Sequence, residues 1–411
     1  MELKPGYKLT EVGVIPEAWK VAALENLIDQ SRRVTYGIVV PGSLVLNGIP
    51  MIRAQDYSKG WVDIEDLYRV SPTIDKAYKR SKVVSGDILL TIVGSVGNLA
   101  KVPHDFDGSN ITQQTARLSF NNKIADADYY WNVLLSDIGK KALLNYTKSG
   151  VQPSLNLSDV EKFLLPLPPL PEQRSIATAL SDMDELLGGL DRLITKKHDL
   201  KQSAMQQLLT GKTRLPEFGE GKGYKQTEIG LIPEDWEIDR VESFVSITTG
   251  NRNTQDRIED GQYPFFVRSQ TIERINSYSF DGEAVLTAGD GVGTGKVFHY
   301  INGKFDCHQR VYKISNFKPE LNGFFFYIYF SNHFYDRIMS MTAKSSVDSV
   351  RMEMIADMLM PFPPLKEQIA IASILSDMDT EITTLEQRRN KTRDLKQAMM
   401  QELLTGRIRL L

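Results

Sequence analysis

The sequence predicts an α+β protein: two mixed α/β domains joined by two long helices that pair as an antiparallel coiled coil, in a pseudo-two-fold circular arrangement. The main observation is an internal duplication. Residues 165–215 return as residues 360–410 with 27 of 51 positions identical, and residues 7–19 return as 224–236. The repeated 51-residue segments carry helical apolar periodicity, whereas the sequence between them is strand-like with Gly and Pro turns. A repeat of this length is a domain plus a helix, not a short solenoid unit.

The two repeat units also close into a ring. Tyr224 follows Arg214 by ten residues, and Tyr7 would follow Arg409 by nine if the chain ends were joined. This spacing predicts that the two terminal segments lie close together. The predicted division along the chain is a first domain over residues 1–165, a first long helix over 166–215, a second domain over 216–360 and a second long helix over 361–411.

Each repeated segment reads as one long helix. Proline is tolerated in the first helical turn but not inside it, so the helices are expected to begin near Pro171 and Lys366. Gly211 and Gly406 each follow Leu-Leu-Thr and fit a left-handed cap at the helix end. Apolar residues spaced by four and three predict a coiled-coil seam, formed by Ile176, Leu180, Met183, Leu187, Leu190, Ile194, Ile371, Leu375, Met378, Ile382 and Leu385.

The seam is too long for one helix to bury alone. The span 171–210 would measure about 60 Å at roughly 1.5 Å per residue. In a ring of two units the natural partner is the other helix, running antiparallel. The pattern slips near Lys197, and Leu200, Ala204 and Leu208 are expected to restart the seam. The alternative is two separate core helices in two separate domains.

Composition limits the function without identifying it. Charged residues make up 25% of the chain, hydrophobic residues 41%, and the net charge is −3. This balance excludes a freestanding, strongly basic nucleic-acid binder, so any DNA contact requires local patches or a basic partner. A single cysteine, Cys307, excludes a disulfide framework and suits a reducing, cytoplasmic location. Neither a signal segment nor an apolar run of membrane-spanning length is evident.

The two variable segments, residues 20–164 and 237–359, resemble each other only in patches. The matched patches are Gly86–Thr91 with Gly282–Thr287, Arg53–Gln55 with Arg268–Gln270, Gln113–Gln114 with His308–Gln309, and Gln30–Arg33 with Gly250–Asn253. A duplicated frame with different polar loops suits the recognition of two different short sequences. Arg and Gln carry the paired donors and acceptors that match guanine and adenine edges.

These matched patches, together with Arg117 and Arg310 nearby in the sequence, supply the candidate DNA-binding residues. Taken singly, each has a simpler explanation as a solvated surface residue, and the hypothesis depends on their recurrence in both units. The candidates are Arg32, Arg33, Arg53, Gln55, Gln113, Gln114, Arg117, Arg252, Asn253, Arg268, Gln270, His308, Gln309 and Arg310.

No catalytic motif is complete. The segment 289–296 (GDGVGTGK) resembles a phosphate-binding loop, but Asp290 and Val297 stand where that motif needs Gly and Ser or Thr, so a tight turn after a strand is expected instead. Five scattered histidines and one cysteine do not predict a zinc site. Neither a Gly-x-Ser-x-Gly nucleophile motif nor the Asn/Asp-Pro-Pro-aromatic tetrapeptide of amino-methyltransferases occurs.

The doubled motifs resemble the specificity subunit of Type I restriction-modification systems. They are the proline-rich entry ending in Glu-Gln, the Ser-Asp-Met-Asp helix, the Asp-Leu-Lys-Gln to Leu-Leu-Thr-Gly exit, and the Ile-Pro-Glu-x-Trp lead-in. The resemblance covers essentially the whole chain. One departure is Gln152-Pro153-Ser154-Leu155 in the first unit against Val347-Asp348-Ser349-Val350 in the second.

The resemblance implies two target recognition domains, each reading one half of a split, asymmetric site on double-stranded DNA, with the helices setting the unread spacer. It also implies partners: two modification subunits that use S-adenosylmethionine to methylate adenine, and restriction subunits that use ATP and Mg to cut DNA. No catalysis, metal, cofactor or membrane contact is expected of this chain itself. The alternatives are a coiled-coil assembly scaffold that does not read DNA, and an enzyme hidden in residues 237–359.

Overall fold

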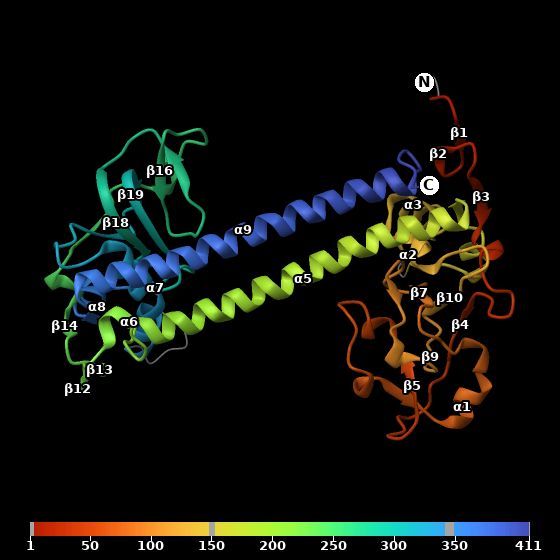
Figure 1. The fold of residues 1–411 in the computed structure, drawn as a ribbon, viewed down its shortest axis with the longest axis horizontal. Helices are drawn as coiled ribbons and strands as arrows, with labels where there is room; N and C mark the ends of the chain where they lie inside the picture. Colours follow the sequence, from red (N-terminus) through yellow and green to blue (C-terminus); the bar gives the residue numbers. More distant parts are fainter. Residues whose placement is uncertain (1–3, 148–152, 342–348, 411) are drawn as a thin grey trace. The chain divides into compact units, whose positions relative to one another are not determined.

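The computed structural model describes residues 4–147, 153–341 and 349–410. The chain forms two compact units (Figure 1). Unit 1 contains Met1–Asp191 and Gln387–Leu411, and unit 2 contains Arg192–Glu386. Each unit therefore combines one α/β domain with a stretch of both long helices. The predicted fold class is confirmed, while the four-segment division, which follows chain order, stays a prediction.

The two long helices have the bounds expected from their proline and glycine signals. Helix α5 spans Leu170–Leu208 and helix α9 spans Leu365–Leu404. The caps at Gly211 and Gly406 both have φ of 68°, the left-handed conformation predicted for them. A Cβ at either glycine would also lie 2.5 Å from a proline ring atom of the same unit. Glycine is thus required at these positions twice over, by backbone conformation and by close packing.

Within each unit the two helices run antiparallel. In unit 1, Lys396 bonds to Asp184 at 2.5 Å and Arg389 lies 3.5 Å from Asp191, so partner numbers fall in one helix as they rise in the other. In unit 2, Lys197 and Lys201 pair in the same sense, with Glu381 at 2.7 Å and Asp379 at 2.5 Å. Exposed ion pairs of this kind contribute about 0–1 kcal/mol each, so the apolar seam carries most of the stability.

The predicted seam residues lie on the inner face of the helices: seven of the eleven are buried, and Met183, Leu187, Met378 and Leu385 are half-buried. The seam merges with the domain core at the end of each unit. In unit 1, for example, Ile176 packs in one cluster with Trp19 and Leu404. The expected restart at Leu200 is wrong, because that side chain is 47% exposed.

The unit 1 domain is built on two small sheets. Strands β4, β10, β7 and β8 form one sheet in that order, and β6, β5 and β9 form the other. The sheet elements are β4 (Thr35–Tyr36), β5 (Ile49–Ile52), β6 (Tyr68–Val70), β7 (Ile88–Thr91), β8 (Leu99–Lys101), β9 (Asn110–Ile111) and β10 (Thr115–Leu118). The remaining elements are β1 (Tyr7–Thr10), β2 (Gly13–Pro16), β3 (Lys20–Ala23), α1 (Pro72–Ala77), α2 (Ala127–Leu135), α3 (Asp137–Tyr146), α4 (Leu157–Val160) and β11 (Leu164–Leu167).

The unit 2 domain merges the same parts into one six-stranded sheet, in the order β15, β20, β18, β19, β16, β17. The long strand β19 pairs antiparallel with β18 and then parallel with β16, so it replaces both β8 and β9. The sheet elements are β15 (Ser246–Thr249), β16 (Tyr263–Phe266), β17 (Glu273–Ile275), β18 (Phe280–Ala288), β19 (Phe298–Cys307) and β20 (Val311–Ser315). The others are α6 (Pro216–Gly219), β12 (Tyr224–Thr227), β13 (Gly230–Pro233), β14 (Glu237–Arg240), α7 (Gly323–Ser340), α8 (Met352–Ala356) and β21 (Leu359–Phe362).

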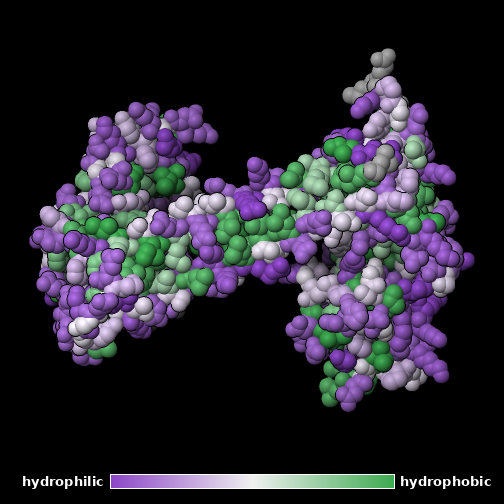
Figure 2. Space-filling model, in the orientation of Figure 1, coloured by the Kyte–Doolittle hydropathy of each residue, from purple (hydrophilic) through white to green (hydrophobic). Residues whose placement is uncertain are grey.

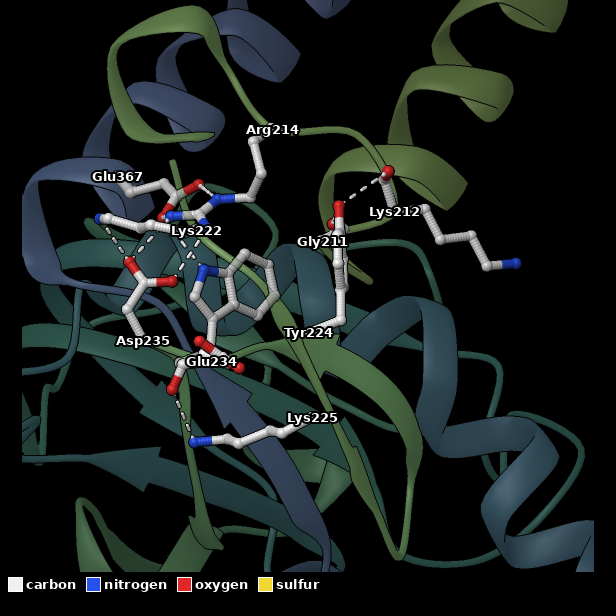
Figure 3. A network of polar contacts seen from close by, with 10 residues as sticks. Gly211, Lys212, Arg214, Lys222, Tyr224, Lys225, Glu234, Asp235 and Glu367 are labelled. Carbon is white, nitrogen blue, oxygen red and sulfur yellow. Dashed lines mark hydrogen bonds and ion pairs between the residues drawn. The ribbon is translucent and has the colours of Figure 1, made fainter. Parts of the chain in front are cut away.

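A buried polar cluster, here called the helix clamp, fastens the two helices to each domain. In unit 2 it consists of Trp236, Glu367 and Arg214, and the last two of these are labelled in Figure 3. The fully buried Glu367 carboxylate accepts hydrogen bonds from the Trp236 indole at 3.0 Å and from two guanidinium nitrogens of Arg214 at 2.5 and 2.7 Å. Arg214 also forms a two-point ion pair with Asp235, at 2.9 and 3.1 Å.

The unit 1 clamp repeats this arrangement with Trp19, Glu172 and Arg409. The Trp19 indole donates to Glu172 at 2.9 Å, and the Arg409 guanidinium contacts the same carboxylate at two points. The hydroxyl of Tyr7 donates to the carbonyl of Gly406 at 3.0 Å, as Tyr224 does to Gly211 at 3.2 Å. The N-terminal and C-terminal segments of the chain therefore pack together in unit 1, as the ring closure predicted.

The glutamine that follows each clamp glutamate ties the domain to the same helical turn. The Gln173 amide accepts from the backbone of Asp126, which caps α2, and donates to the carbonyls of Ile124 and Pro168. Gln368 makes the corresponding three bonds in unit 2, including one to the cap of α7. Buried amides with all bonds made fix orientation, so each domain has a defined angle to the start of its long helix.

Hydrophilic residues cover most of the visible face of each unit, interrupted by separate apolar patches (Figure 2). Among the described residues, no helix combines the length and hydropathy needed to cross a bilayer.

Candidate DNA interface

In unit 1, backbone hydrogen bonds gather three chain segments beside the start of β10. The Ile92 amide donates to Gln114 at 2.8 Å, and the Leu155 amide donates to Ile92 at 2.9 Å. The Gln113 amide donates to Ile38 at 3.0 Å. These bonds fix the backbones at Gln113 and Gln114, while their side chains stay exposed. Two amide side chains are thereby presented on a rigid sheet end.

Unit 2 repeats the same bonds with different residues. The Gly289 amide donates to Arg310 at 2.8 Å, and the Val350 amide donates to Gly289 at 2.7 Å. The Gln309 amide donates to Arg252 at 2.8 Å. Thr249, Asn251, Asp290, Tyr312 and Ser349 join these segments in lining a groove. The groove is formed by four segments from distant parts of the sequence, residues 249–251, 289–290, 309–312 and 349–350, and the fold brings them together.

This register corrects the matching of the two units. It equates Gln113 with Gln309 and Gln114 with Arg310, one residue away from the sequence-based pairing of Gln113 with His308. It also equates Gly250 with Gly37: a Cβ at Gly37 would lie 1.8 Å from the carbonyl oxygen of Ile111, and one at Gly250 would lie 1.9 Å from that of Cys307. The predicted match of Gly250–Asn253 with Gln30–Arg33 is therefore wrong. Ile52 and Phe266 are likewise equivalent, because they hold the same register in the parallel pairs β5–β9 and β16–β19. Arg268 therefore lies one residue beyond the position equivalent to Arg53.

Three predicted residues are engaged inside the fold. Arg117 is 2% exposed and donates to the carbonyls of Arg80, Lys82 and Arg33. Burial, with the charge of Arg32, lowers the pKa of Arg117 to about 10. Arg32 forms a two-point ion pair with the buried Asp87 at 2.6 and 2.9 Å. Arg117 and Arg32 are therefore structural residues and are not part of the proposed interface.

His308 is also a structural residue, because it is 5% exposed and its Nδ1 accepts from the Arg310 amide at 2.9 Å. Burial lowers the pKa of His308, and the neighbouring cation Arg268 lowers it further, so the ring is neutral at pH 7. The prediction that His308 contacts DNA is wrong for this conformation. Its role is to hold the backbone of Arg310.

The unit 2 candidates form one polar cluster. Arg268 bonds to Asp290 at 2.9 Å, and the Arg310 guanidinium lies 3.7 Å from the other oxygen of that carboxylate. The Gln309 amide donates to Asn253 at 2.7 Å. Arg252 bonds to the buried Asp306 at 3.1 Å. Gln270 is exposed two residues after Arg268.

The unit 1 candidates are more dispersed. Arg53 is held by Asp56, with the closest contact at 2.8 Å, and Gln55 is exposed beside it. Gln113 and Gln114 lie at the start of β10, whereas Arg33 precedes β4 at a different part of the sheet. Gln152, Val347 and Asp348, where the two units depart from each other, lie outside the described residues.

Sequence reasoning missed Asp290, Asn251 and Ser349 as members of the groove. Asp290 carried a signal, since it stands where a phosphate-binding loop needs glycine, but the sequence did not show its two arginine partners. The segment 289–297 joins β18 to β19 without opening a helix, as expected for a turn. Within the described ranges, no group of three or more His, Cys, Asp or Glu side chains is arranged to hold a metal ion.

Comparisons with known proteins agree with the doubled architecture. A family model described as "Type I restriction modification DNA specificity domain" matches this chain twice, over residues 46–196 and 233–392. The putative type I restriction enzyme MjaX specificity subunit of Methanocaldococcus jannaschii is 26% identical over 427 residues, covering 98% of this chain and 96% of the relative. The type I restriction enzyme EcoBI specificity subunit of Escherichia coli is 33% identical over 202 residues, covering 48% of this chain and 42% of the relative.

A solved structure shows the same fold across the chain. The crystal structure of a Type I restriction-modification S subunit from M. genitalium aligns with a TM-score of 0.60 at 13% identity, covering 98% of this chain and 99% of that one. These findings favour the DNA-specificity hypothesis over the scaffold that does not read DNA. The two family matches cover most of both repeat units, and the chain therefore belongs to the Type I restriction-modification DNA specificity subunits.

Proposed function

We propose that this chain is the sequence-specific DNA-recognition subunit of a Type I restriction-modification complex. Each domain reads one half of a bipartite, asymmetric site on double-stranded DNA, and the two long helices set the length of the unread spacer. The observation that carries the proposal is the shared backbone register with different exposed side chains, Gln113–Gln114 in unit 1 and Gln309–Arg310 in unit 2. Two domains with the same backbone arrangement but different exposed polar side chains are suited to reading two different half-sites.

The charge of the chain supports a shared mode of DNA binding. A net charge of −3 gives the chain no overall excess of positive charge for the phosphate neutralisation that dominates protein–DNA affinity. Several arginines of the candidate interface are also paired with aspartates, which reduces the local positive charge. We therefore assign base reading to this chain and most of the phosphate contacts to partner subunits.

The partners we propose are two modification subunits, which bind S-adenosylmethionine and methylate adenine, and restriction subunits, which use ATP and Mg to cut DNA. This chain directs them to the site and catalyses no step itself. Purified chain alone is expected to show no methyl transfer, nuclease or ATPase activity. Methyl transfer by the chain, retained through further purification, would contradict this assignment.

The function is tested by exchanging one domain within the full complex. Replacing residues 20–164 with the equivalent segment of a related specificity subunit is expected to change one half of the methylated site and leave the other half intact. The matched control exchanges residues 237–359 and is expected to change the other half. Mapping of methylated adenines on a random-sequence DNA library gives the result. An exchange that alters both halves, or neither, would show that the domains do not read independently.

A further inference from the structure

Two exposed side chains occupy the same backbone position in the two units. Gln114 precedes β10, and its carbonyl accepts from Ile92; Arg310 precedes β20, and its carbonyl accepts from Gly289. Both of these loop residues, Ile92 and Gly289, also accept from the segment just before α4 or α8. These four bonds, two in each unit, therefore place the backbones of Gln114 and Arg310 at equivalent positions on equivalent sheets.

The residues that follow Ile92 and Gly289 differ between the two units. An isolated bridge pairs Val93 with Ser154 in unit 1, and Asp290 with Ser349 in unit 2. Thus the apolar Val93 in unit 1 holds the backbone position that Asp290, the carboxylate neighbour of Arg310, holds in unit 2. Exchange of a neutral pair for a charged pair at one place is what two readers of different bases require.

Asp290 orients Arg310 without consuming its donors. The Arg310 nitrogen lies 3.7 Å from the carboxylate, beyond hydrogen-bond range, while Arg268 holds the other oxygen at 2.9 Å. The Arg310 side chain is 64% exposed. Among the described residues, its one acidic contact is Asp290. The guanidinium is therefore directed by charge but free to bind a ligand at the groove.

We propose that Arg310 and Gln114 are matched specificity-determining residues, Arg310 reading a guanine in one half-site and Gln114 an adenine in the other, with Asp290 as the residue that positions Arg310. This inference rests on the proposed DNA-recognition function. Arginine binds O6 and N7 of guanine in a bidentate manner, and glutamine binds N6 and N7 of adenine. The two side chains thus supply the complementary halves of this code from one shared backbone position.

The local charge favours a base edge over a phosphate as the ligand of Arg310. The Asp290 carboxylate contacts both arginines and offsets one of their two positive charges, which weakens the attraction of a phosphate to either one. The edge of a guanine carries no net charge, and its two acceptors tolerate a nearby carboxylate. Asp290 thereby acts as a filter that selects an uncharged acceptor pair.

The test uses the complete modification complex and a random-sequence DNA library, with the methylated sites read by sequencing. The main variant is Arg310→Gln with Asp290→Val, which copies the unit 1 pair into unit 2. The reciprocal variant is Gln114→Arg with Val93→Asp. The control is Arg240→Gln, which makes the same arginine substitution at an exposed ion pair on β14. In every variant, the half-site of the unchanged unit reports whether the complex is assembled and active.

The main variant is expected to lose its preference for guanine at one position of one half-site, by about 5- to 150-fold, and to prefer adenine there. The reciprocal variant is expected to exchange adenine for guanine in the other half-site, and the control to leave both unchanged. Uniform weakening at all sequences would identify a phosphate contact and overturn the inference, as would an unchanged motif or a wild-type half-site composed only of A·T pairs. If the wild-type complex methylates no bipartite motif, the proposed function fails instead.

Discussion

Removal of Arg214 from the unit 2 helix clamp should destabilise that unit by several kcal/mol. The Glu367 carboxylate is fully buried and the Arg214 side chain is only 6% exposed. Arg214→Met would leave this carboxylate without its counter-charge, which costs about 3–5 kcal/mol for a buried pair. Arg409 is 24% exposed, so water compensates in part, and Arg409→Met should cost unit 1 about 2–3 kcal/mol.

The size of the loss also predicts a rescue. Adding Glu367→Gln to Arg214→Met removes the unpaired charge and keeps a side-chain oxygen that accepts from the Trp236 indole, now at 3.0 Å. The double variant should therefore recover about 1–3 kcal/mol, because neutral replacement of a buried ion pair is tolerated better than loss of one partner. Lys212→Met, which removes an equal charge two residues away, is the matched control.

The assay is urea unfolding followed by pulsed hydrogen exchange and mass spectrometry. Peptides from residues 224–240 report on unit 2, and peptides from residues 7–23 report on unit 1. Arg214→Met should shift the unit 2 transition alone, and Arg409→Met the unit 1 transition alone. Equal shifts of both transitions, or losses below about 1 kcal/mol, would refute the assignment of the clamp as a buried ion pair that stabilises one unit.

Three further outcomes are expected. First, burial raises the pKa of Asp235, but its bonds to Arg214 and Lys222 outweigh this and bring the pKa to about 2. A carboxyl group whose pKa is lowered by folding stabilises the fold above its unfolded pKa of 3.8, so unit 2 should lose about 1–2 kcal/mol of unfolding free energy as pH falls from 3.8 toward 2. Asp235→Asn should flatten this loss in acid titrations. Second, Ala18→Asp places a carboxylate where unit 2 has Asp235, and should raise the free energy of unfolding of unit 1, measured by urea titration, by about 0.5–1 kcal/mol. No gain would mean that the clamps are not equivalent. Third, four-residue insertions made together after Thr195 and Asn390 should widen the unread spacer by about one or two base pairs. They add roughly 6 Å to each helix, and DNA rises about 3.4 Å per base pair. An active variant with an unchanged spacer in methylation mapping would show that the helices do not set the spacer length.

The sequence predicted the helices well because their signals are local. Proline before Leu170 and glycine after Leu208 bound α5 without reference to anything distant. The helix clamp was missed although all its members recur in both repeats. In the sequence Glu172 was noted only as part of the repeated Glu-Gln entry, whereas its partners Trp19 and Arg409 lie 153 and 237 residues away. Recurrence at fixed offsets was the available signal.

The candidate interface was predicted less well, because a side chain's type does not reveal its burial. Arg117 looks like a reader by composition, but it lies in a strand whose four residues are all buried. The pairing of Gln113 with His308 was one residue off, because the two domains have diverged and only the hydrogen-bond register identifies equivalent positions. In unit 2, Arg268 and Arg310 both lie against Asp290, and Gln309, next to Arg310, bonds to Asn253.

The pairing of β3 with β11, and of β14 with β21, has a genetic consequence. Each pair brings the chain's entry into a domain beside its exit, with Ala23 opposite Leu164 and Arg240 opposite Leu359. Recombination with breakpoints at these strands would replace everything between them while keeping Trp19, Glu172 and their counterparts in the other copy. A lineage can therefore acquire a new domain by one exchange with two breakpoints, without redesigning the scaffold that holds it.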